Sequence, residues 1–438
     1  MKKYTDKEIE KIVNENKKLK LENSSMKKML NSKRFLAADR IANTFNALLP
    51  EGTRRRGAVN RIEKSIKAVT NRKVKRIIKN INRIKKDKKK VIVIQSIVWD
   101  APLKQRPHHL ARCLAGDNNV LVVYFEPAEQ LHAFRKITSN LVTTNSWEAI
   151  EKICGDEREY YFFFNNVYDI SFKKIEEIKE IGYEIVYEYI DEFHEDVAGS
   201  LVNQLDVWDK LPNLKPALVL ASATKLFNEA KKHFKNNCVR LSRNAVNVED
   251  FDFHLFEDKR TPEDLAKVLE DGKPIVGYYG ALAHWLDYNL ISNFAKKNKD
   301  LNVVLIGVNY QHALEKLDQR IKNIHYLGPK KYDELPLYSA KFDCAIIPFQ
   351  TGQIAKGTSP VKLFEYMAMG LPTVGTKDLD ECRGYDYVYL ADGVVDFGNK
   401  IKRGIVEHAN PEAKERLLAQ ARENSWQARA DDILRWLA

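Results

Sequence analysis

The feature that most constrains the fold is an alternation of apolar, β-branched runs with stretches of helical periodicity. Runs rich in β-branched, aromatic and other apolar residues occur at 91–97, 120–125, 160–164, 184–190 and 217–222. Runs of this kind are typical of strands buried on both faces of a sheet. Helical patterns, for example at 108–115 and 172–181, lie between them. Strands that alternate with helices indicate an α/β fold with a parallel, doubly wound sheet.

The alternation then starts again after a charged, proline-containing stretch at 256–274. The second series of apolar runs lies at 274–280, 301–307, 323–328, 343–349 and 371–376. A chain of 438 residues is also too long for one ordinary core. We therefore predict two Rossmann-like domains that face a cleft, at 91–255 and 272–400. Residues 401–438 are predicted to pack back on the body as a C-terminal helix, with 411–437 as one long helix.

Residues 1–90 form a strongly basic extension. They carry 29 Lys and Arg against 9 Asp and Glu, a net +20, whereas the whole chain is only +12, so the remainder is −8. A coiled coil is one interpretation of 1–33. Residues 54–90 predict a basic amphipathic helix, which has two interpretations: an in-plane anchor on an anionic membrane, or a helix packed on the body with a solvated outer face.

The composition excludes several classes of protein. Five scattered cysteines without a CxxC pair argue against a disulfide framework and against structural zinc, and no metal site is expected. No apolar run approaches the roughly 20 residues that span a bilayer, and the N-terminus has no apolar signal region. We predict a cytoplasmic location. Peripheral attachment to the inner face of the cell membrane is a further expectation, which depends on the anchor interpretation of 54–90.

Ligands of open parallel sheets collect beyond the carboxyl ends of the strands, and a cleft between two such domains is the default site. Residues 277–287 follow one strand and contain Gly280, Trp285 and Asp287. Backbone N–H groups at such a turn bind phosphate, which makes these three residues candidates for donor binding. The alternative is that Gly280 only makes the turn and Asp287 only caps a helix.

The segment 357–372 gives the sharpest pattern. Ser359 and Pro360 suit the N-cap and first position of a helix, on which Lys362 and Glu365 share one face. A cation near a helix N-terminus is unfavourable unless an anion such as a diphosphate is bound there. A carboxylate in the same place could accept two hydrogen bonds from a ribose diol. The alternative is a capped surface helix with an incidental Lys–Glu pair.

Two other segments carry candidates for the reaction and the acceptor. Asp191 and His194 follow the strand at 184–190, which places them near the acceptor or the transferred sugar as candidate catalytic residues. Arg106 and His108 follow the first strand and its loop, where Arg106 could bind an anionic acceptor. A polar loop and an exposed loop arginine are the alternatives.

The order of these segments resembles a known family. The matching pieces are Trp99-Asp100 with 105–109, 189–191, 244–247 with Phe251, 277–280 with Trp285 and Asp287, Ile306-Gly307, Leu327-Gly328, Pro348-Phe349, and the segment from Ser359-Pro360 through 370–372. Together they are similar to retaining GT-B glycosyltransferases of family 4, in the branch that builds teichuronic-acid-like and other bacterial surface polysaccharides. The resemblance covers about 91–400.

The resemblance implies a nucleotide diphosphate sugar donor on the C-terminal domain and a glycan or polyprenyl-linked acceptor on the N-terminal domain. Glu365 corresponds to the second Glu of the family's Glu-x7-Glu motif, which binds the donor ribose, whereas Gly357 stands where the first Glu is expected. The usual Arg and Lys phosphate pair is also absent, and Lys356 or Lys362 is expected to take its place. The family needs no side-chain nucleophile, since the leaving phosphate helps to deprotonate the acceptor, and no cofactor is expected.

Two other functions are compatible with the sequence. A sugar-nucleotide 2-epimerase shares the double Rossmann fold, and a non-catalytic scaffold of a glycan assembly complex would explain the missing Glu. Nucleic acid is not an expected partner, because no aromatic residues interleave with the basic residues at 54–90.

Overall fold

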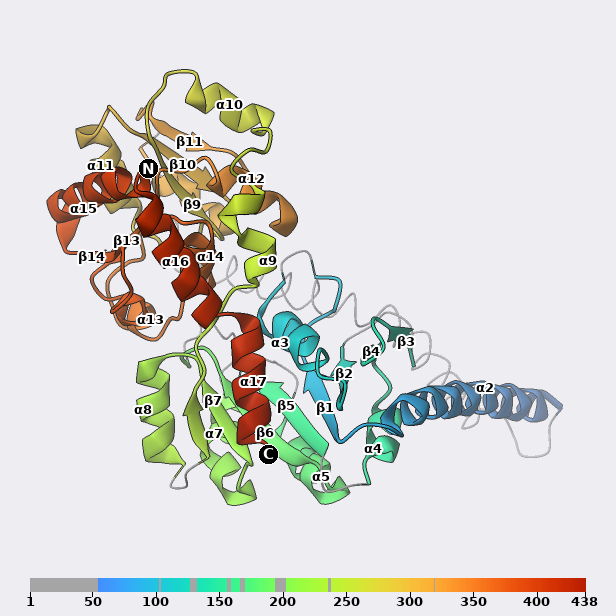
Figure 1. The fold of residues 1–438 in the computed structure, drawn as a ribbon. Helices are drawn as coiled ribbons and strands as arrows, with labels where there is room; N and C mark the ends of the chain where they lie inside the picture. Colours follow the sequence, from blue (N-terminus) through green and yellow to red (C-terminus); the bar gives the residue numbers. More distant parts are fainter. Residues whose placement is uncertain are drawn as a thin grey trace, which may run out of the picture. The chain divides into compact units, whose positions relative to one another are not determined.

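The computed structural model describes residues 54–438 except 102–103, 127–131, 156–158, 166–169, 194–201, 235–237 and 319. For residues 54–69 and 353–354 it describes the backbone alone. The coiled coil considered for 1–33 lies outside these residues. The chain divides into two compact units: residues up to Trp99 with Asn118–Glu159, and Asp100–Asp117 with Tyr160–Ala438. Figure 1 labels their helices and strands.

The strands of the first unit follow the order β3-β4-β2-β1. Their bounds are β1 (Lys90–Gln95), β2 (Val120–Phe125), β3 (Phe134–Lys136) and β4 (Leu141–Thr144). β1, β2 and β4 are parallel, and only the short β3 runs antiparallel. Val91 to Ile94 and Val120 to Tyr124 are almost completely buried, as expected for strands covered on both faces. The two predicted strands of this unit are confirmed.

The helix α2 (Arg54–Lys85) packs on α4 (Trp147–Ile153). Val74, Ile77 and Ile81 are buried, whereas the intervening basic side chains of the described part are exposed. Those exposed residues are Arg72, Lys73, Lys75, Arg76, Lys79 and Arg83. For residues 70–85 the structure therefore agrees with the packed-helix interpretation. The apolar stripe there is buried in protein and is not available for insertion into a membrane.

The second unit begins with α3 (Arg106–Leu114) and a group of parallel strands in the order β5-β6-β7-β8. The strand bounds are β5 (Glu159–Phe164), β6 (Glu184–Tyr189), β7 (Leu218–Ala221) and β8 (Val239–Leu241). The helical segments among them are α5 (Phe172–Ile181), α7 (Val202–Lys210), η1 (Leu211–Leu214) and α8 (Thr224–His233). The predicted runs at 160–164, 184–190 and 217–222 are confirmed as strands.

A second sheet follows, with the order β11-β10-β9-β12-β13-β14 and every described pairing parallel. Its strands are β9 (Ile275–Tyr279), β10 (Asn302–Ile306), β11 (Ile324–Tyr326), β12 (Cys344–Ile347), β13 (Thr373–Thr376) and β14 (Val388–Ala391). In chain order this is 3-2-1-4-5-6, the order of a dinucleotide-binding sheet. The direction of chain progress reverses between β9 and β12, so the fold predicts a ligand at the carboxyl ends of those two strands.

The remaining helical segments connect these strands or cover them (Figure 1). They are α9 (Val248–Phe251), η2 (Phe253–Leu255), α10 (Glu263–Leu269), α11 (Tyr288–Lys297), η3 (Tyr310–Lys316), η4 (Tyr332–Glu334), α12 (Leu335–Ser339), α13 (Gln353–Lys356), α14 (Val361–Ala368), η5 (Asp380–Cys382) and α15 (Gly393–His408). α15 packs against β13 and β14, and α14 packs against β13.

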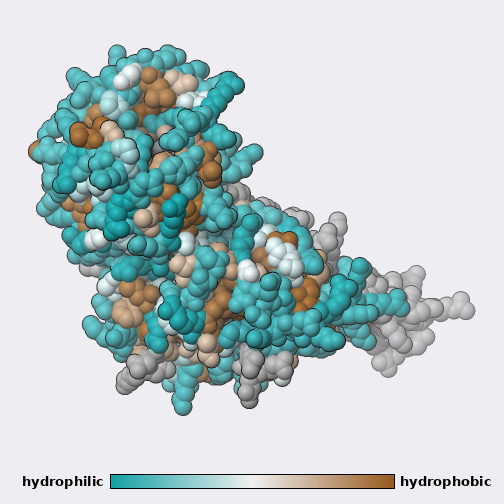
Figure 2. Space-filling view, in the orientation of Figure 1, coloured by the Kyte–Doolittle hydropathy of each residue, from teal (hydrophilic) through white to brown (hydrophobic). Residues whose placement is uncertain are grey.

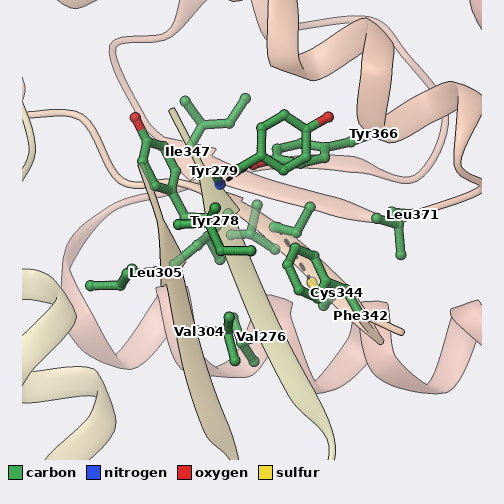
Figure 3. Packing of buried hydrophobic residues seen from close by; sticks show 14 of the residues in the cluster. Val276, Tyr278, Tyr279, Val304, Leu305, Phe342, Cys344, Ile347, Tyr366 and Leu371 are labelled. Atoms are coloured by element: carbon green, nitrogen blue, oxygen red, sulfur yellow. Dashed lines mark hydrogen bonds between the residues drawn. The ribbon is translucent and has the colours of Figure 1, made fainter. Parts of the chain in front are cut away.

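Large aromatic side chains fill the core of the second sheet (Figure 3). The backbone N–H of Tyr279 donates a hydrogen bond to the hydroxyl of Tyr366 at 3.0 Å, which joins β9 to α14. Gly277 has no room for a side chain, because a Cβ there would overlap the ring of Phe342. β9 and α14 are therefore fixed relative to each other, and these two elements carry the candidate site.

The C-terminal residues correct one prediction. Residues 411–437 form two helices, α16 (Pro411–Glu423) and α17 (Trp426–Trp436), and not a single one. Ser425 interrupts the helical run, because it adopts extended backbone angles and its hydroxyl accepts a hydrogen bond from the Ala428 N–H as an N-cap. α16 packs on α14 and α17 packs on α3, so the last helices do pack back on the body.

None of the helices in the described residues is both long enough and apolar enough to cross a bilayer. On the face drawn in Figure 2, polar residues predominate and apolar residues lie in scattered groups.

Candidate functional site

Two glycines shape the carboxyl ends of β9 and β10. Gly280 has a φ of +138° and Gly307 a φ of +147°, conformations that residues with side chains rarely adopt. The Gly280 N–H donates to the Ile306 carbonyl at 2.9 Å, and a Cβ on Gly307 would overlap the carbonyl of Gly280. The backbone at the switch point of the sheet is therefore bare of side chains, which is what a close approach of phosphate requires.

Lys362 lies over this bare backbone. A Cβ on Gly280 would contact Cε of Lys362 at 2.9 Å and its Nζ at 3.3 Å. The ammonium lies 5.4 Å from the ring centres of both Tyr278, in β9, and Phe349, two residues after β12. The described residues give it no ion pair. Burial lowers the pKa of Lys362 and Glu365 opposes that change, so a bound anion would stabilise its charged form.

Glu365 lies one turn further along α14 and is buried. Its Oε1 accepts a hydrogen bond from the hydroxyl of Tyr332 at 3.0 Å. Tyr332 is held in turn by the rings of Phe251 and His109, at 5.3 and 5.9 Å between centroids. Burial raises the pKa of Glu365, while Tyr332 and Lys362 lower it. A carboxylate with one oxygen fixed in this way is oriented before any ligand binds.

The start of α14 differs from the prediction. Pro360 is the N-cap and makes no side-chain cap, and the helix begins at Val361. The Ser359 hydroxyl accepts a hydrogen bond from the Asn244 N–H at 3.2 Å, and the Ser359 carbonyl accepts one from Asn244 Nδ2 at 2.7 Å. Ser359 therefore ties the loop before α14 to Asn244 and does not cap the helix.

Arg106 belongs to the same network. Its Nη1 donates to Asn244 Oδ1 at 3.4 Å, its Nη2 donates to Ser242 Oγ at 2.9 Å, and its Nε pairs with Glu188 Oε2 at 2.9 Å. The side chains of Arg106 and Glu188 are only 3% and 0% exposed. Arg106 is thus a buried arginine that neutralises a buried carboxylate in β6. This internal contact matches neither the contact with an anionic acceptor nor the exposed loop arginine that the sequence analysis considered.

His108 is also buried, and its Nδ1 accepts a hydrogen bond from the Gln105 N–H at 3.1 Å. These contacts of Arg106 and His108 are thus with the protein itself. Both fix the start of α3, and through Asn244 Arg106 also helps to fix the loop that leads into α14.

The other candidates lie as follows. Asp191 follows β6, and its carbonyl accepts a hydrogen bond from Asn165 Nδ2 at 2.6 Å. Asp287 is the N-cap of α11, since its Oδ1 accepts from the Leu290 N–H at 2.8 Å. Trp285 is partly buried, Lys356 ends α13, and His194 lies outside the described residues. The capping alternative for Asp287 is thus observed.

A family model described as "Glycosyl transferases group 1" matches residues 273–404. That range contains the whole second sheet and α14, with the bare glycines, Lys362 and Glu365. The chain carries a group 1 glycosyltransferase domain.

The chain also has a curated relative. A Bacillus subtilis protein, described as a teichuronic acid biosynthesis glycosyltransferase, is 25% identical over 198 residues. The match covers 42% of this chain, and it spans only about half, 48%, of that relative.

Solved structures extend the likeness to most of the chain. A sucrose-phosphate synthase from Thermosynechococcus elongatus gives a TM-score of 0.56 at 14% identity, covering 79% of this chain and 98% of that one. An Escherichia coli trehalose-6-phosphate protein bound with UDP-2-fluoro glucose gives 0.58 at 9% identity, covering 79% and 98%. At such identities the likeness concerns the fold. It confirms the predicted GT-B class, an α/β fold with two Rossmann-like domains.

Proposed function

We propose that this chain transfers a sugar from a nucleoside diphosphate sugar to a glycan or lipid-linked acceptor during synthesis of a surface polysaccharide, with retention of configuration. The observation that carries the proposal is the position of Lys362 and Glu365. Lys362, which forms no ion pair with the described residues, and the oriented carboxylate of Glu365 project from one helix at the switch point of a dinucleotide-type sheet. The group 1 domain match and the polysaccharide relative support the reaction class.

In this proposal each group of the site has one task. The Lys362 ammonium and the backbone around Gly280 and Gly307 bind the diphosphate, and their charge stabilises it as it leaves. Glu365, oriented by Tyr332, accepts hydrogen bonds from the ribose hydroxyls. Rate enhancement then comes from orientation and from stabilisation of the departing diphosphate, without a side-chain nucleophile.

Two further features are proposed to serve the acceptor. Asp191 follows the carboxyl end of β6. Of the two residues predicted to contact the acceptor or the transferred sugar, it is the one that the structure describes. The exposed basic face of α2 would attract an anionic membrane at the cytoplasmic surface, where each Lys or Arg near the surface contributes about 1 kcal/mol. This attraction would be electrostatic, because the apolar residues of the described part are buried.

A thermal-shift screen against UDP-, GDP-, ADP- and dTDP-linked hexoses tests the proposal first, since a specific ligand raises the melting temperature by mass action. The donor that it selects is then radiolabelled and incubated with polyprenyl-linked acceptors, with and without EDTA. Transfer of label to the lipid fraction, unchanged by EDTA, is expected.

Other outcomes separate the alternatives. Conversion of the free donor into its 2-epimer would identify an epimerase. Tight donor binding without transfer or hydrolysis would support the scaffold, which is the alternative that the glycine at 357 favours. A screen in which no nucleoside diphosphate sugar raises the melting temperature contradicts the proposal.

A further inference from the structure

Gly357, in the loop between α13 and α14, is a glycine for reasons of space. Its φ is not in the left-handed region, so the backbone there would accept any ordinary residue. A Cβ on Gly357 would lie 2.8 Å from both Cγ and Cδ of Glu192, and it would overlap the carboxylate oxygen Oε1. The space in which a side chain of residue 357 would begin is thus occupied by the carboxylate of Glu192.

Glu192 reaches this loop from the carboxyl end of β6, the edge of a parallel sheet where ligands collect. The next residue, Phe193, stacks on Tyr189 at 5.2 Å and lies edge-on to Trp208 at 5.3 Å between centroids. These contacts fix the backbone beside Glu192. The Glu192 carboxylate forms an ion pair with Lys225, at the start of α8.

The pair remains accessible. The side chains of Glu192 and Lys225 are 17% and 28% exposed, so a ligand can reach them, in contrast to the sealed pair of Arg106 and Glu188. The loop residue that Glu192 contacts, Gly357, is also close in sequence to the proposed donor site. Gly357 is two residues before Ser359, which Asn244 fixes, and five before Lys362.

We propose that Glu192 binds the transferred sugar of the donor, and so supplies from the loop after β6 the carboxylate that residue 357 lacks. The ligand class is a hexose with two adjacent free hydroxyl groups, because a carboxylate accepts one hydrogen bond on each oxygen from such a diol. Lys225 holds the carboxylate in place. This inference rests on the proposed transferase function.

The first experiment compares a nucleoside diphosphate sugar, the one selected by the screen above, with its nucleoside diphosphate in calorimetric titrations. Glu192→Gln should weaken binding of the sugar nucleotide by about tenfold, since hydrogen bonds to a charged group are lost. Binding of the diphosphate should change by less than about twofold. Lys225→Met is the matched control: it breaks the same ion pair but keeps the carboxylate, so its effect should be smaller.

If Glu192→Gln and Lys225→Met weaken the sugar nucleotide and the diphosphate equally, the pair only joins two segments of the protein and the inference is overturned. If the wild-type protein binds none of the sugar nucleotides, the proposed function fails, and the inference fails with it. Wild-type transfer with an unaffected Glu192→Gln variant overturns the inference alone.

A residue exchange gives the second experiment. Gly357→Glu alone forces two carboxylates into one space and should weaken sugar nucleotide binding. Glu192→Gly alone removes the carboxylate and should do the same. The double variant returns a single carboxylate to that space, now from residue 357, and should recover the wild-type preference for sugar nucleotide over diphosphate to within about threefold. No recovery in a double variant with a wild-type melting temperature contradicts the inference.

Discussion

Replacement of Arg106 by methionine is expected to destabilise the protein strongly. The guanidinium pairs with Glu188, and the two side chains are 3% and 0% exposed. Removal of one partner of a buried ion pair leaves an uncompensated charge, which costs about 3–5 kcal/mol. The hydrogen bonds to Ser242 Oγ and the Arg243 carbonyl are lost as well. A fall in melting temperature of about 6 °C or more is expected.

The size of the effect should depend on pH. Burial raises the pKa of Glu188, and Arg106 lowers it, so the pKa rises further when the arginine is lost. Between the ordinary pKa of a carboxyl and this raised value the folded variant holds a proton that the unfolded chain releases. The stability of the variant relative to the wild type therefore falls as the pH rises, and the loss should be larger at pH 8 than at pH 5.

Thermal melts of Arg106→Met at the two pH values test this reasoning. Arg112→Met, on the exposed face of the same helix, is the matched control and should change the melting temperature little. Arg106→Met with Glu188→Leu should recover most of the loss, because no buried charge remains. A stable Arg106→Met protein that has lost only acceptor binding would refute the internal role and support the acceptor contact predicted from the sequence.

Three further predictions concern the donor site and the basic helix. Burial raises the pKa of Glu365 to about 6, so donor affinity should fall as the pH is lowered through that value. Glu365→Gln should remove this pH dependence, and a variant with the same pH dependence as the wild type would exclude the ribose contact. Lys362→Ala should lower the transfer rate more than Lys356→Ala, and the reverse order would place the diphosphate at the loop. Lys75→Glu with Lys79→Glu should reduce co-sedimentation with anionic vesicles at an unchanged melting temperature, and unchanged sedimentation would exclude attraction by this face.

The strands that were predictable share one physical cause. Runs such as 91–94 and 303–306 are buried on both faces, so every position is apolar and the pattern is unmistakable. The missed strands β3, β4, β8 and β14 are short, with three or four residues each, and β3 and β14 are also less buried. β14 has four residues, of which only Ala391 is fully buried, and β3 has three with none buried. Their pairing partners, not their own sequences, make them strands.

The site was predictable only where its parts are close in sequence. Lys362 and Glu365 share a helix face, so their spacing was sufficient to place them together. Asn244 contacts the loop before α14 from more than 100 residues away, and Tyr332 contacts Glu365 in α14 from about 30 residues away. No spacing in the sequence signals such contacts. Ser359 has the composition of an N-cap, yet it bonds Asn244, because tertiary contacts override a local preference. Glu192 was missed for the same reason: only the structure shows that it fills the space at residue 357.

The central claim is that a nucleoside diphosphate sugar binds at the carboxyl ends of β9 and β12, through Lys362 and Glu365. The most direct test is a calorimetric titration of the selected nucleoside diphosphate into the wild type, Lys362→Ala and Glu365→Ala, with Lys356→Ala as control. Lys362→Ala and Glu365→Ala should each raise the dissociation constant about tenfold or more, and the control should remain within about threefold of the wild type. Equal affinity in all four proteins, with unchanged melting temperatures, would place the nucleotide elsewhere and contradict this account.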